Sequence, residues 1–395
     1  MNNFWEKLPT PFFALAPMAD VTDPAFRMIV TKYSRYGGVD IYDKYGKFTR
    51  HHAQRVGGPD VLWTEFVSAD GLASAGREVL KRDLEYTEAE RPIVAQLFSS
   101  NPEKMRIASK LCAELGFDGI DINMGCPDRS IEKQGAGACM IKTPEIASTI
   151  IQAAKDGVKD AGKNILVSVK TRVGYNKVEI DTWIPHLLAQ DIAALTVHAR
   201  TRKEMSAVPA RWEHIKQIVE IRDKMNLKTK ILGNGDVKDM DDAYDKWRAT
   251  GCDGIMIGRA IFGNPWLFSK NISRAKYIPV KSTHKSLLAF CSARASRAVQ
   301  GFFQKYILHS KKRSDKDKYW LHTDKGVSTS EKLRVLVEHT KLFEELLGDI
   351  KSFAIMKKHF KAYVNGFDGA KELRMQLMET KNAKEVETII NEFFK

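Results

Sequence analysis

The sequence predicts an α/β fold, a (β/α)8 barrel of the TIM type followed by a small all-helical C-terminal domain. Three observations predict it. Between about residues 11 and 268, eight short apolar runs alternate with longer amphipathic ones; several amphipathic runs end in glycine; and beyond residue 268 only helical periodicity remains. Eight strands with intervening helices in about 250 residues is the size of such a barrel.

The eight apolar runs are the predicted strands, and they cover residues 12–18, 61–67, 92–98, 119–125, 165–172, 194–200, 230–236 and 254–260. Between them, residues 102–116 and 237–251 show helical periodicity and close on a glycine, the residue preferred just past a helix end. A doubly wound open sheet is the competing fold. It is disfavoured because its glycine fingerprint is missing after the first strand, where Pro17–Met18–Ala19 stands instead.

A chain of 395 residues exceeds what one hydrophobic core usually fills, so we expect two domains. Residues 1–270 are predicted to form a catalytic barrel and residues 271–395 a basic helical domain. The helical periodicity of the second part covers 284–308, 331–347, 351–364 and 383–394. The segments 35–60 and 311–330 fit no clean period; we expect an elaborated first connection and a charge-dense loop.

The charge of the chain is concentrated in its C-terminal third. The whole sequence has 63 Lys and Arg against 49 Asp and Glu, whereas residues 271–395 alone have 25 against 14, a net +11. Such asymmetry indicates a polyanionic partner, nucleic acid first and a membrane surface second. A solvated basic face is an equally good interpretation of the charge taken alone.

Other bulk features exclude several classes of protein. No apolar run approaches 18 residues, so no transmembrane helix is expected, and the N-terminus lacks the basic and apolar regions of a signal peptide. The five cysteines are odd in number and not spaced as metal ligands, which favours a reducing cytoplasm and predicts no metal site.

The active site of such a barrel lies at the carboxyl ends of its strands. Every predicted strand ends in a polar or otherwise special residue, although a strand buried on both faces has no structural need for one. Any single one is explained by a satisfied hydrogen bond or a helix cap, but eight in register form a ring that favours a ligand. The ring comprises Pro17, Met18, Glu65, Gln96, Asn123, Cys126, Lys170, Arg172, His198, Arg200, Asn234, Asp236, Gly258 and Arg259.

Two loops indicate which ligand this is. The stretches "GNGD" (233–236) and "GRAIFGNP" (258–265) follow strands seven and eight, the usual phosphate-binding position of these barrels. Glycines there let backbone N–H groups approach an anion. One phosphate fits better than a dinucleotide, and Gln96 with Lys170 can hydrogen-bond a flat heterocycle, so a flavin mononucleotide fits the pattern.

Seven ordered motifs resemble those of the tRNA-dihydrouridine synthase family. They are "APMADVTDPAFR" (16–27), "AQLF" (95–98), "DINMGCPDRSIEKQGAGACMI" (121–141), "VSVKTRVG" (167–174), "TVHARTR" (196–202), "GNGDV" (233–237) and "IGRAIFGNPWLF" (257–268). The stretch 356–374 is similar to the C-terminal signature of that family. The resemblance implies an FMN-containing barrel that reduces a uridine of tRNA to 5,6-dihydrouridine, with NADPH recharging the flavin.

The resemblance also implies roles for individual residues. Cys126 matches the catalytic acid, while Asn123 and Arg172 stand where the family contacts the flipped uracil. The residues that match cofactor contacts are Pro17, Met18 and Ala19; Gln96 and Lys170 at the flavin ring; His198; and Asn234, Gly235, Asp236, Gly258 and Arg259 at the phosphate. Arg211 departs from the pattern, because relatives often carry an acidic residue there.

A thiol suits the chemistry that the resemblance implies. Hydride transfer from the reduced flavin to C6 of uracil leaves enolate character toward C5, which then needs a proton from the opposite face. A thiol with a pKa of about 8.5 is mostly protonated at neutral pH and can still donate its proton. Taken alone, a cysteine is more often a small buried apolar residue, and Cys112, Cys139 and Cys252 are interpreted in this way.

The resemblance implies tRNA as the partner, and we expect a monomer. A stacked base is unreachable, so the nucleotide must be extruded, and the +11 helical domain is expected to hold the rest of the tRNA, with Lys311, Lys312 and Arg313 as exposed contacts. Two alternatives remain. One is another FMN-dependent barrel reductase that acts on a small metabolite, and the other is a non-catalytic RNA-binding protein.

Overall fold

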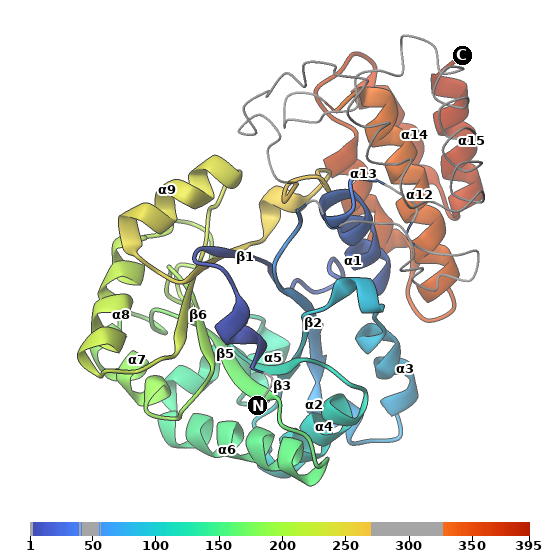
Figure 1. Cartoon of the computed structure of the whole chain (residues 1–395). Coiled ribbons are helices and arrows are strands. Elements are labelled where there is room, and N and C mark those ends of the chain that lie inside the picture. Colours follow the sequence, from blue (N-terminus) through green and yellow to red (C-terminus); the bar gives the residue numbers. More distant parts are fainter. Residues whose placement is uncertain (1–2, 39–40, 42–54, 56, 270–326) are drawn as a thin grey trace, which may run out of the picture. The chain divides into compact units, whose positions relative to one another are not determined.

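The computed structural model describes residues 3–38, 41, 55, 57–269 and 327–395, and within them eight parallel strands form a barrel (Figure 1). The sheet order is β1-β8-β7-β6-β5-β4-β3-β2, and a bridge from Ala14 to Val61 joins its two ends. The predicted barrel and all eight predicted strands are therefore confirmed. The strands are β1 Phe12–Leu15, β2 Leu62–Ser68, β3 Ile93–Phe98, β4 Gly119–Met124, β5 Leu166–Arg172, β6 Ala194–His198, β7 Lys230–Asn234 and β8 Gly254–Ile257.

Helices connect successive strands and lie outside the barrel (Figure 1). They are α1 Pro24–Val30, α2 Ala69–Leu72, α3 Arg77–Lys81, α4 Pro102–Glu114, α5 Arg129–Lys133, α6 Pro144–Asp160, α7 Ile180–Leu188, α8 Glu213–Lys224 and α9 Met240–Thr250. The start of α4 shows why they form where they do: Asn101 accepts the Lys104 N–H at 3.1 Å, and Pro102 occupies the first turn. Helix α9 ends at Gly251, whose φ of 68° suits glycine.

The inner face of the barrel changes from apolar to polar along its axis. At the amino end, Phe12, Trp63 and Leu232 belong to one buried cluster, and Trp5 of the N-terminal turn packs against Trp63 with ring centroids 6.0 Å apart. Side chains alternate between the two faces of a strand, so every second residue points into the barrel. Nearer the carboxyl end these inward positions hold polar residues, such as Gln96, which pairs in register with Asp121. The amino end is thus plugged by aromatic rings, and the polar residues lie at the carboxyl end.

The described C-terminal residues, 327–395, form four α-helices, α12 Thr329–Leu347, α13 Met356–Tyr363, α14 Ala370–Glu379 and α15 Ala383–Phe393. Helical structure here was predicted, but α14 was missed, because the Gly366 and Gly369 turn before it breaks the periodicity of a short segment. The predicted 351–364 helix begins only at Met356. The segments 284–308 and 311–326 and most of 35–60 lie outside the described residues.

Residues Thr329–Lys395 belong to the same compact unit as the barrel, and α12 packs against α1. A buried ion pair cluster accompanies this contact. The Lys351 ammonium lies 2.7 Å from a carboxylate oxygen of Glu65 and 2.7 Å from one of Asp83. These three side chains are between 5% and 17% exposed. Lys351 therefore neutralises two carboxylates of the barrel that are nearly removed from water.

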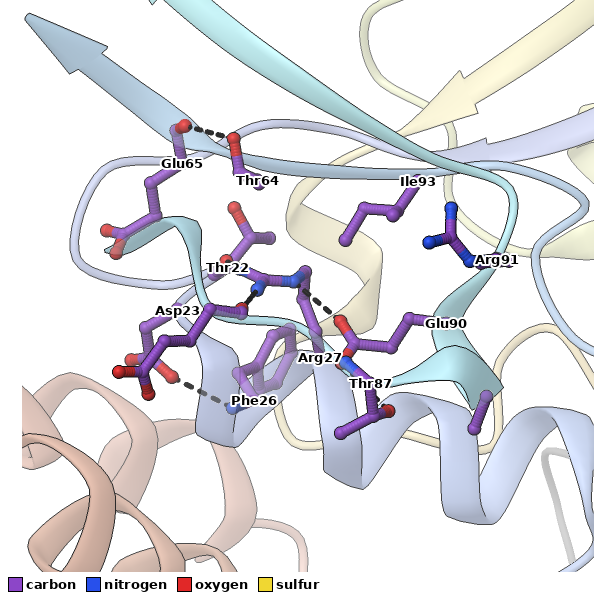
Figure 2. A network of polar contacts seen from close by, with 12 residues as sticks. Thr22, Asp23, Phe26, Arg27, Thr64, Glu65, Thr87, Glu90, Arg91 and Ile93 are labelled. Atoms are coloured by element: carbon purple, nitrogen blue, oxygen red, sulfur yellow. Dashed lines mark hydrogen bonds and ion pairs between the residues drawn. The ribbon is translucent and has the colours of Figure 1, made fainter. Parts of the chain in front are cut away.

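A second buried network fixes the loop between β1 and α1 (Figure 2). The Arg27 guanidinium forms an ion pair with Glu90 at 2.8 Å, both side chains being fully buried, and donates to the Thr22 carbonyl at 2.7 Å. Thr22 in turn accepts the Met18 N–H on its hydroxyl oxygen at 2.9 Å. The backbone of Met18, predicted to contact the cofactor, is thus held through Thr22 by a buried charge.

We expect Lys351→Met to lower the free energy of unfolding by about 3–5 kcal/mol at neutral pH, because it strands two nearly buried carboxylates. Burial raises the pKa of Glu65, so in the mutant this carboxyl can take up a proton as the pH falls. The deficit should therefore shrink at about pH 5. Urea denaturation at both pH values measures it.

The matched control is Lys341→Met, whose ion pair with Glu387 is 2.6 Å long but about half exposed. It should cost under about 1 kcal/mol. Equal losses in the two mutants, or a Lys351→Met deficit that does not change with pH, would contradict the interpretation.

Candidate active site

The predicted site residues converge at the carboxyl end of the barrel. Parallel pairing places Asn123 beside Lys170, Arg172 beside His198, and His198 beside Asn234. Glu65 of the predicted ring does not join them. An irregularity between Trp63 and Phe66 sets three residues of β2 against two of β3, and the Glu65 carboxylate instead pairs with Lys351.

A continuous chain of hydrogen bonds runs from the barrel interior to the predicted catalytic cysteine. Gln96 donates to the Asp121 carboxylate at 2.6 Å, and Asn123 donates to the Gln96 carbonyl oxygen at 3.2 Å. The Asn123 carbonyl oxygen then accepts the backbone N–H groups of Gly125 at 3.1 Å and Cys126 at 2.9 Å. Burial raises the pKa of Asp121 to about 6, so this carboxyl is mostly ionised at neutral pH and can accept.

The backbone of Cys126 is held on its other side as well. Its carbonyl oxygen accepts the Ala138 N–H at 2.9 Å. Gly137, at φ 64°, allows this contact, because a Cβ there would lie 2.7 Å from the same oxygen. Burial raises the pKa of the Cys126 thiol above its ordinary value; the Asp128 backbone N–H, Lys170 and Arg172 oppose the rise, and the Asp128 charge adds to it. The partly exposed thiol is therefore protonated at neutral pH.

Two cations lie next to this thiol on β5. Burial and the neighbouring Arg172, opposed in part by Asp121, lower the pKa of Lys170 to about 8. Arg172 donates to the Gly125 carbonyl at 2.7 Å and to the Thr201 carbonyl at 3.2 Å. The Lys170 ammonium, by contrast, forms no hydrogen bond or ion pair with any residue that the structure describes, so a cation at this depth is left for a ligand.

The other side of the site is organised by Asp236. Its carboxylate pairs with Arg200, accepts the Ala210 N–H at 2.9 Å and accepts from Arg259 at 2.7 Å. Arg200 also donates to Nε2 of His198 at 3.1 Å. Since a guanidinium cannot accept, Nε2 is the acceptor, and in the neutral ring the proton sits on Nδ1. Burial, together with the surrounding cations, lowers the pKa of His198 well below its ordinary value.

The loops predicted to bind phosphate lie beside these groups. Gly235 adopts φ 125°, and a Cβ there would lie 2.9 Å from Ala210 and 3.1 Å from the His198 ring. Gly258 sits beside the Met18 side chain, because β1 and β8 are neighbours in the closed barrel. Asn234 uses its amide to donate to the Met256 carbonyl at 2.9 Å. Arg259, with its side chain 68% exposed, is the cation nearest the solvent.

The donor set fits a flavin. Gln96 and Asn123 each use one of their two amide N–H groups within the protein, so one N–H remains on each. The Lys170 ammonium has no hydrogen-bond or ion-pair partner among the described residues. A ligand at this place must therefore present acceptors and tolerate positive charge, as the carbonyl and ring-nitrogen edge of a flavin does. Of the predicted flavin-ring contacts, Lys170 and His198 are partly exposed, whereas Gln96 is fully buried and donates to Asp121 behind Asn123.

Sequence reasoning missed some residues of the site. Asp121 precedes Asn123 by two positions on one strand, so the period of two was a signal that both point inward. The ion pair of Arg202 with Glu132 joins the loops after β6 and β4 and had no local signal. The departure at Arg211 is explained by its two hydrogen bonds to Glu204, at 2.7 and 3.0 Å.

Two of the other cysteines, Cys112 and Cys252, are free and buried, as predicted. The same prediction was wrong for Cys139, which is partly exposed. Within the described part of the chain, no group of three or more His, Cys, Asp or Glu side chains is placed to hold a metal ion. None of the described helices is long and apolar enough to cross a membrane.

Fold and site together define a barrel enzyme with a cationic, donor-lined site at its carboxyl end and a protonated thiol above it. The family model for dihydrouridine synthase (Dus) matches residues 14–320. The chain belongs to this dihydrouridine synthase family and is accordingly an oxidoreductase. Both alternatives, a reductase of another family and a non-catalytic RNA-binding protein, are set aside by this membership.

Similar proteins cover the chain almost end to end. It is 36% identical over 394 residues to the "Probable tRNA-dihydrouridine synthase" of Staphylococcus aureus (strain COL), covering 99% of this chain and 96% of that protein. It is also 36% identical to the "Probable tRNA-dihydrouridine synthase 2" of Bacillus subtilis (strain 168), with coverage of 99% and 97%. Among solved structures, histamine dehydrogenase from Rhizobium sp. 4-9 aligns weakly, with a TM-score of 0.45 at 13% identity over 67% of this chain and 46% of that one.

The environment of Cys126 generates a prediction about its reactivity. Iodoacetamide alkylates only the thiolate, and burial raises the pKa of the Cys126 thiol. The pH at which its alkylation rate is half-maximal should therefore be higher than for an unperturbed cysteine. Mass spectrometry of the modified peptides separates Cys126 from the partly exposed Cys139. Rapid alkylation of Cys126 at neutral pH would contradict a protonated thiol.

Proposed function

We propose that this protein reduces the C5=C6 bond of a uridine in tRNA to 5,6-dihydrouridine, with FMN as the cofactor and NADPH as the reductant. Membership of the dihydrouridine synthase family and the names of its relatives support the reaction and the substrate. The observation that carries the proposal is the protonated Cys126 thiol, fixed through its backbone near Lys170, a cation that has no partner in the described part of the chain.

The cofactor residues divide into two groups. In the first, Arg259 and the N–H groups around Gly235 and Gly258 bind the phosphate, while Asn234 and Asp236 position that loop and its arginine. In the second, Gln96, Lys170 and His198 donate to the ring system, and the Pro17–Met18–Ala19 loop packs beside it. When bound there, the reduced flavin supplies the hydride that C6 of uracil accepts.

Cys126 supplies the proton. Its S–H bond breaks as a C–H bond forms at C5, the electron pair of the S–H bond stays on sulfur, and solvent water returns the proton afterwards. Lys170 and Arg172 stabilise the transient thiolate, since both lower the pKa of Cys126. The remaining N–H groups of Asn123 and Arg172 are donors of the right kind for the uracil carbonyl oxygens.

The rest of the tRNA has to be held elsewhere, because the target base must be extruded from its stack to reach this site. We assign this role to residues 271–395, whose net charge of +11 is the feature that supports it. Lys311, Lys312 and Arg313, the contacts expected from the sequence, lie outside the described residues. We infer a monomer that works in the cytoplasm, where tRNA and NADPH are available.

We expect the protein to purify yellow with non-covalent FMN, and Arg259→Ala to weaken FMN binding. A charge-assisted hydrogen bond to phosphate contributes about 1.5–3 kcal/mol, so the Kd should rise roughly 10- to 150-fold. Quenching of flavin fluorescence measures it. The control is Arg248→Ala, since Arg248 is exposed and pairs only with Asp245 among the described residues. A colourless protein that cannot be reconstituted with FMN would refute the cofactor.

Cys126→Ala should leave FMN content and NADPH oxidation nearly unchanged, because the thiol acts only on the substrate. Dihydrouridine formation should fall about 10²- to 10⁴-fold, the usual contribution of a positioned general acid. Single-turnover reoxidation of the reduced enzyme by unmodified tRNA is the measurement. Reoxidation at the wild-type rate in the mutant would exclude Cys126 as the acid.

A further inference from the structure

The side chain of Asn123 is used almost entirely within the protein. Its carbonyl oxygen accepts two backbone N–H groups, those of Gly125 at 3.1 Å and Cys126 at 2.9 Å. Its amide nitrogen donates to Gln96 at 3.2 Å, and the side chain is 5% exposed. A carboxamide oxygen has two acceptor positions, and here both are filled by the two residues at the mouth of β4.

The orientation of this carboxamide is fixed from both ends. The backbone N–H groups require an oxygen on one side of Asn123. On the other side, the Asp121 carboxylate requires an N–H from Gln96, so Gln96 turns its oxygen toward Asn123 and can only accept there. Ser168 also donates to Asp121, the first residue of this hydrogen-bonded series, and helps to fix its carboxylate. No other assignment of the two amides satisfies all of these contacts.

We propose that Asn123 is the positioning residue for the catalytic thiol: it holds the backbone of Gly125 and Cys126, and Gln96 and Asp121 orient it. The proposal rests on the proposed role of Cys126 as the proton donor. It differs from the role implied by family resemblance, in which Asn123 contacts the uracil. A positioning residue affects the proton-transfer step, whereas a substrate contact made equally in ground and transition states affects mainly KM.

The geometry explains why positioning is needed. Cys126 follows closely after the strand, and its own N–H and carbonyl are held by the Asn123 oxygen and by the Ala138 N–H, while Arg172 donates to the Gly125 carbonyl beside them. The thiol must approach C5 from one side at hydrogen-bond distance. A displacement of about 1 Å can cost about 10²-fold in rate, so the loss of either contact should be visible in turnover.

The experiment is Asn123→Ala in the full-length protein, read out first by iodoacetamide alkylation of Cys126 against pH. Burial is the main reason for the raised pKa of this thiol, the Asp128 backbone N–H lowers that pKa, and the charged groups that act on it are Asp128, Lys170 and Arg172. Releasing the loop exposes the thiol to water while those charges remain. The half-maximal pH should therefore fall toward the ordinary value, and alkylation at neutral pH should become several-fold faster. This readout needs neither flavin nor tRNA.

A matched control is Asn382→Ala, which removes another asparagine that accepts a backbone N–H, from Glu385 at 2.9 Å, in the C-terminal helices. It should leave the alkylation profile of Cys126 unchanged. In turnover, Asn123→Ala should lower kcat with tRNA by about 10²-fold with little change in KM. A raised KM together with an unchanged alkylation profile would overturn the proposal in favour of a substrate contact.

Gln96→Leu provides a second route if Asn123→Ala does not fold. Gln96 is linked to Cys126 through Asn123, so its loss should shift the alkylation profile in the same direction and by less. When Gln96→Leu is added to Asn123→Ala, the alkylation profile of Cys126 should shift no further, because the residue that connects Gln96 to Cys126 is already absent. Additive shifts would show that Gln96 and Asn123 act independently, and would contradict the hydrogen-bonded series that links Gln96 to Cys126 through Asn123. If the wild-type protein does not reduce uridine in tRNA while these shifts are observed, the assigned substrate is wrong and the positioning role stands.

Discussion

Closure of the sheet is the constraint on which the site depends. Once β1 pairs with β8 and Ala14 bridges to Val61, side chains on alternate positions of all eight strands share one interior. The amino half of that interior is filled by rings such as Trp5 and Trp63. The carboxyl half contains amides and charges instead. This division sets the depth at which a ligand can bind, because nothing can enter past the aromatic plug.

The polar half is stabilised by pairing most, but not all, of its charges. Asp236 neutralises Arg200 and Arg259, and Asp121 accepts from Gln96. Lys170 has no such partner among the described residues, and its pKa of about 8 reflects that cost. A bound acceptor would offset the cost, so ligand binding and electrostatic relief are coupled at this position.

The C-terminal helices are joined to the barrel by charges as well as by apolar packing. Lys351 reaches Glu65 and Asp83, and Glu338 accepts from Lys32 at 2.7 Å and Tyr33 at 2.6 Å. Glu338 belongs to α12, and Lys32 and Tyr33 directly follow α1, which itself packs against α12 and whose preceding loop contains Met18. The segment assigned to tRNA and the loop assigned to the cofactor therefore share one supporting helix.

Much of this could be predicted from the sequence, because it depends on local patterns. Eight apolar runs separated by amphipathic ones determine the barrel, and the residues that end the runs identify Cys126, Gln96 and Lys170 as site residues. Short, interrupted periodicity hides an element, as it did for α14. A residue near a strand end points toward the predicted ring of site residues only if the strand is regular. The irregularity in β2 turns Glu65 away from that ring.

Only the tertiary structure decided what each site residue contacts. The hydrogen bond of Asn123 to Gln96 joins positions 27 residues apart, and the ion pair of Arg202 with Glu132 joins positions 70 residues apart. Local patterns cannot specify such contacts, because they depend on how the closed barrel brings different loops to one rim. The sequence by itself determined which chemical groups stand at that rim, and the fold determined which of them remain available to a ligand.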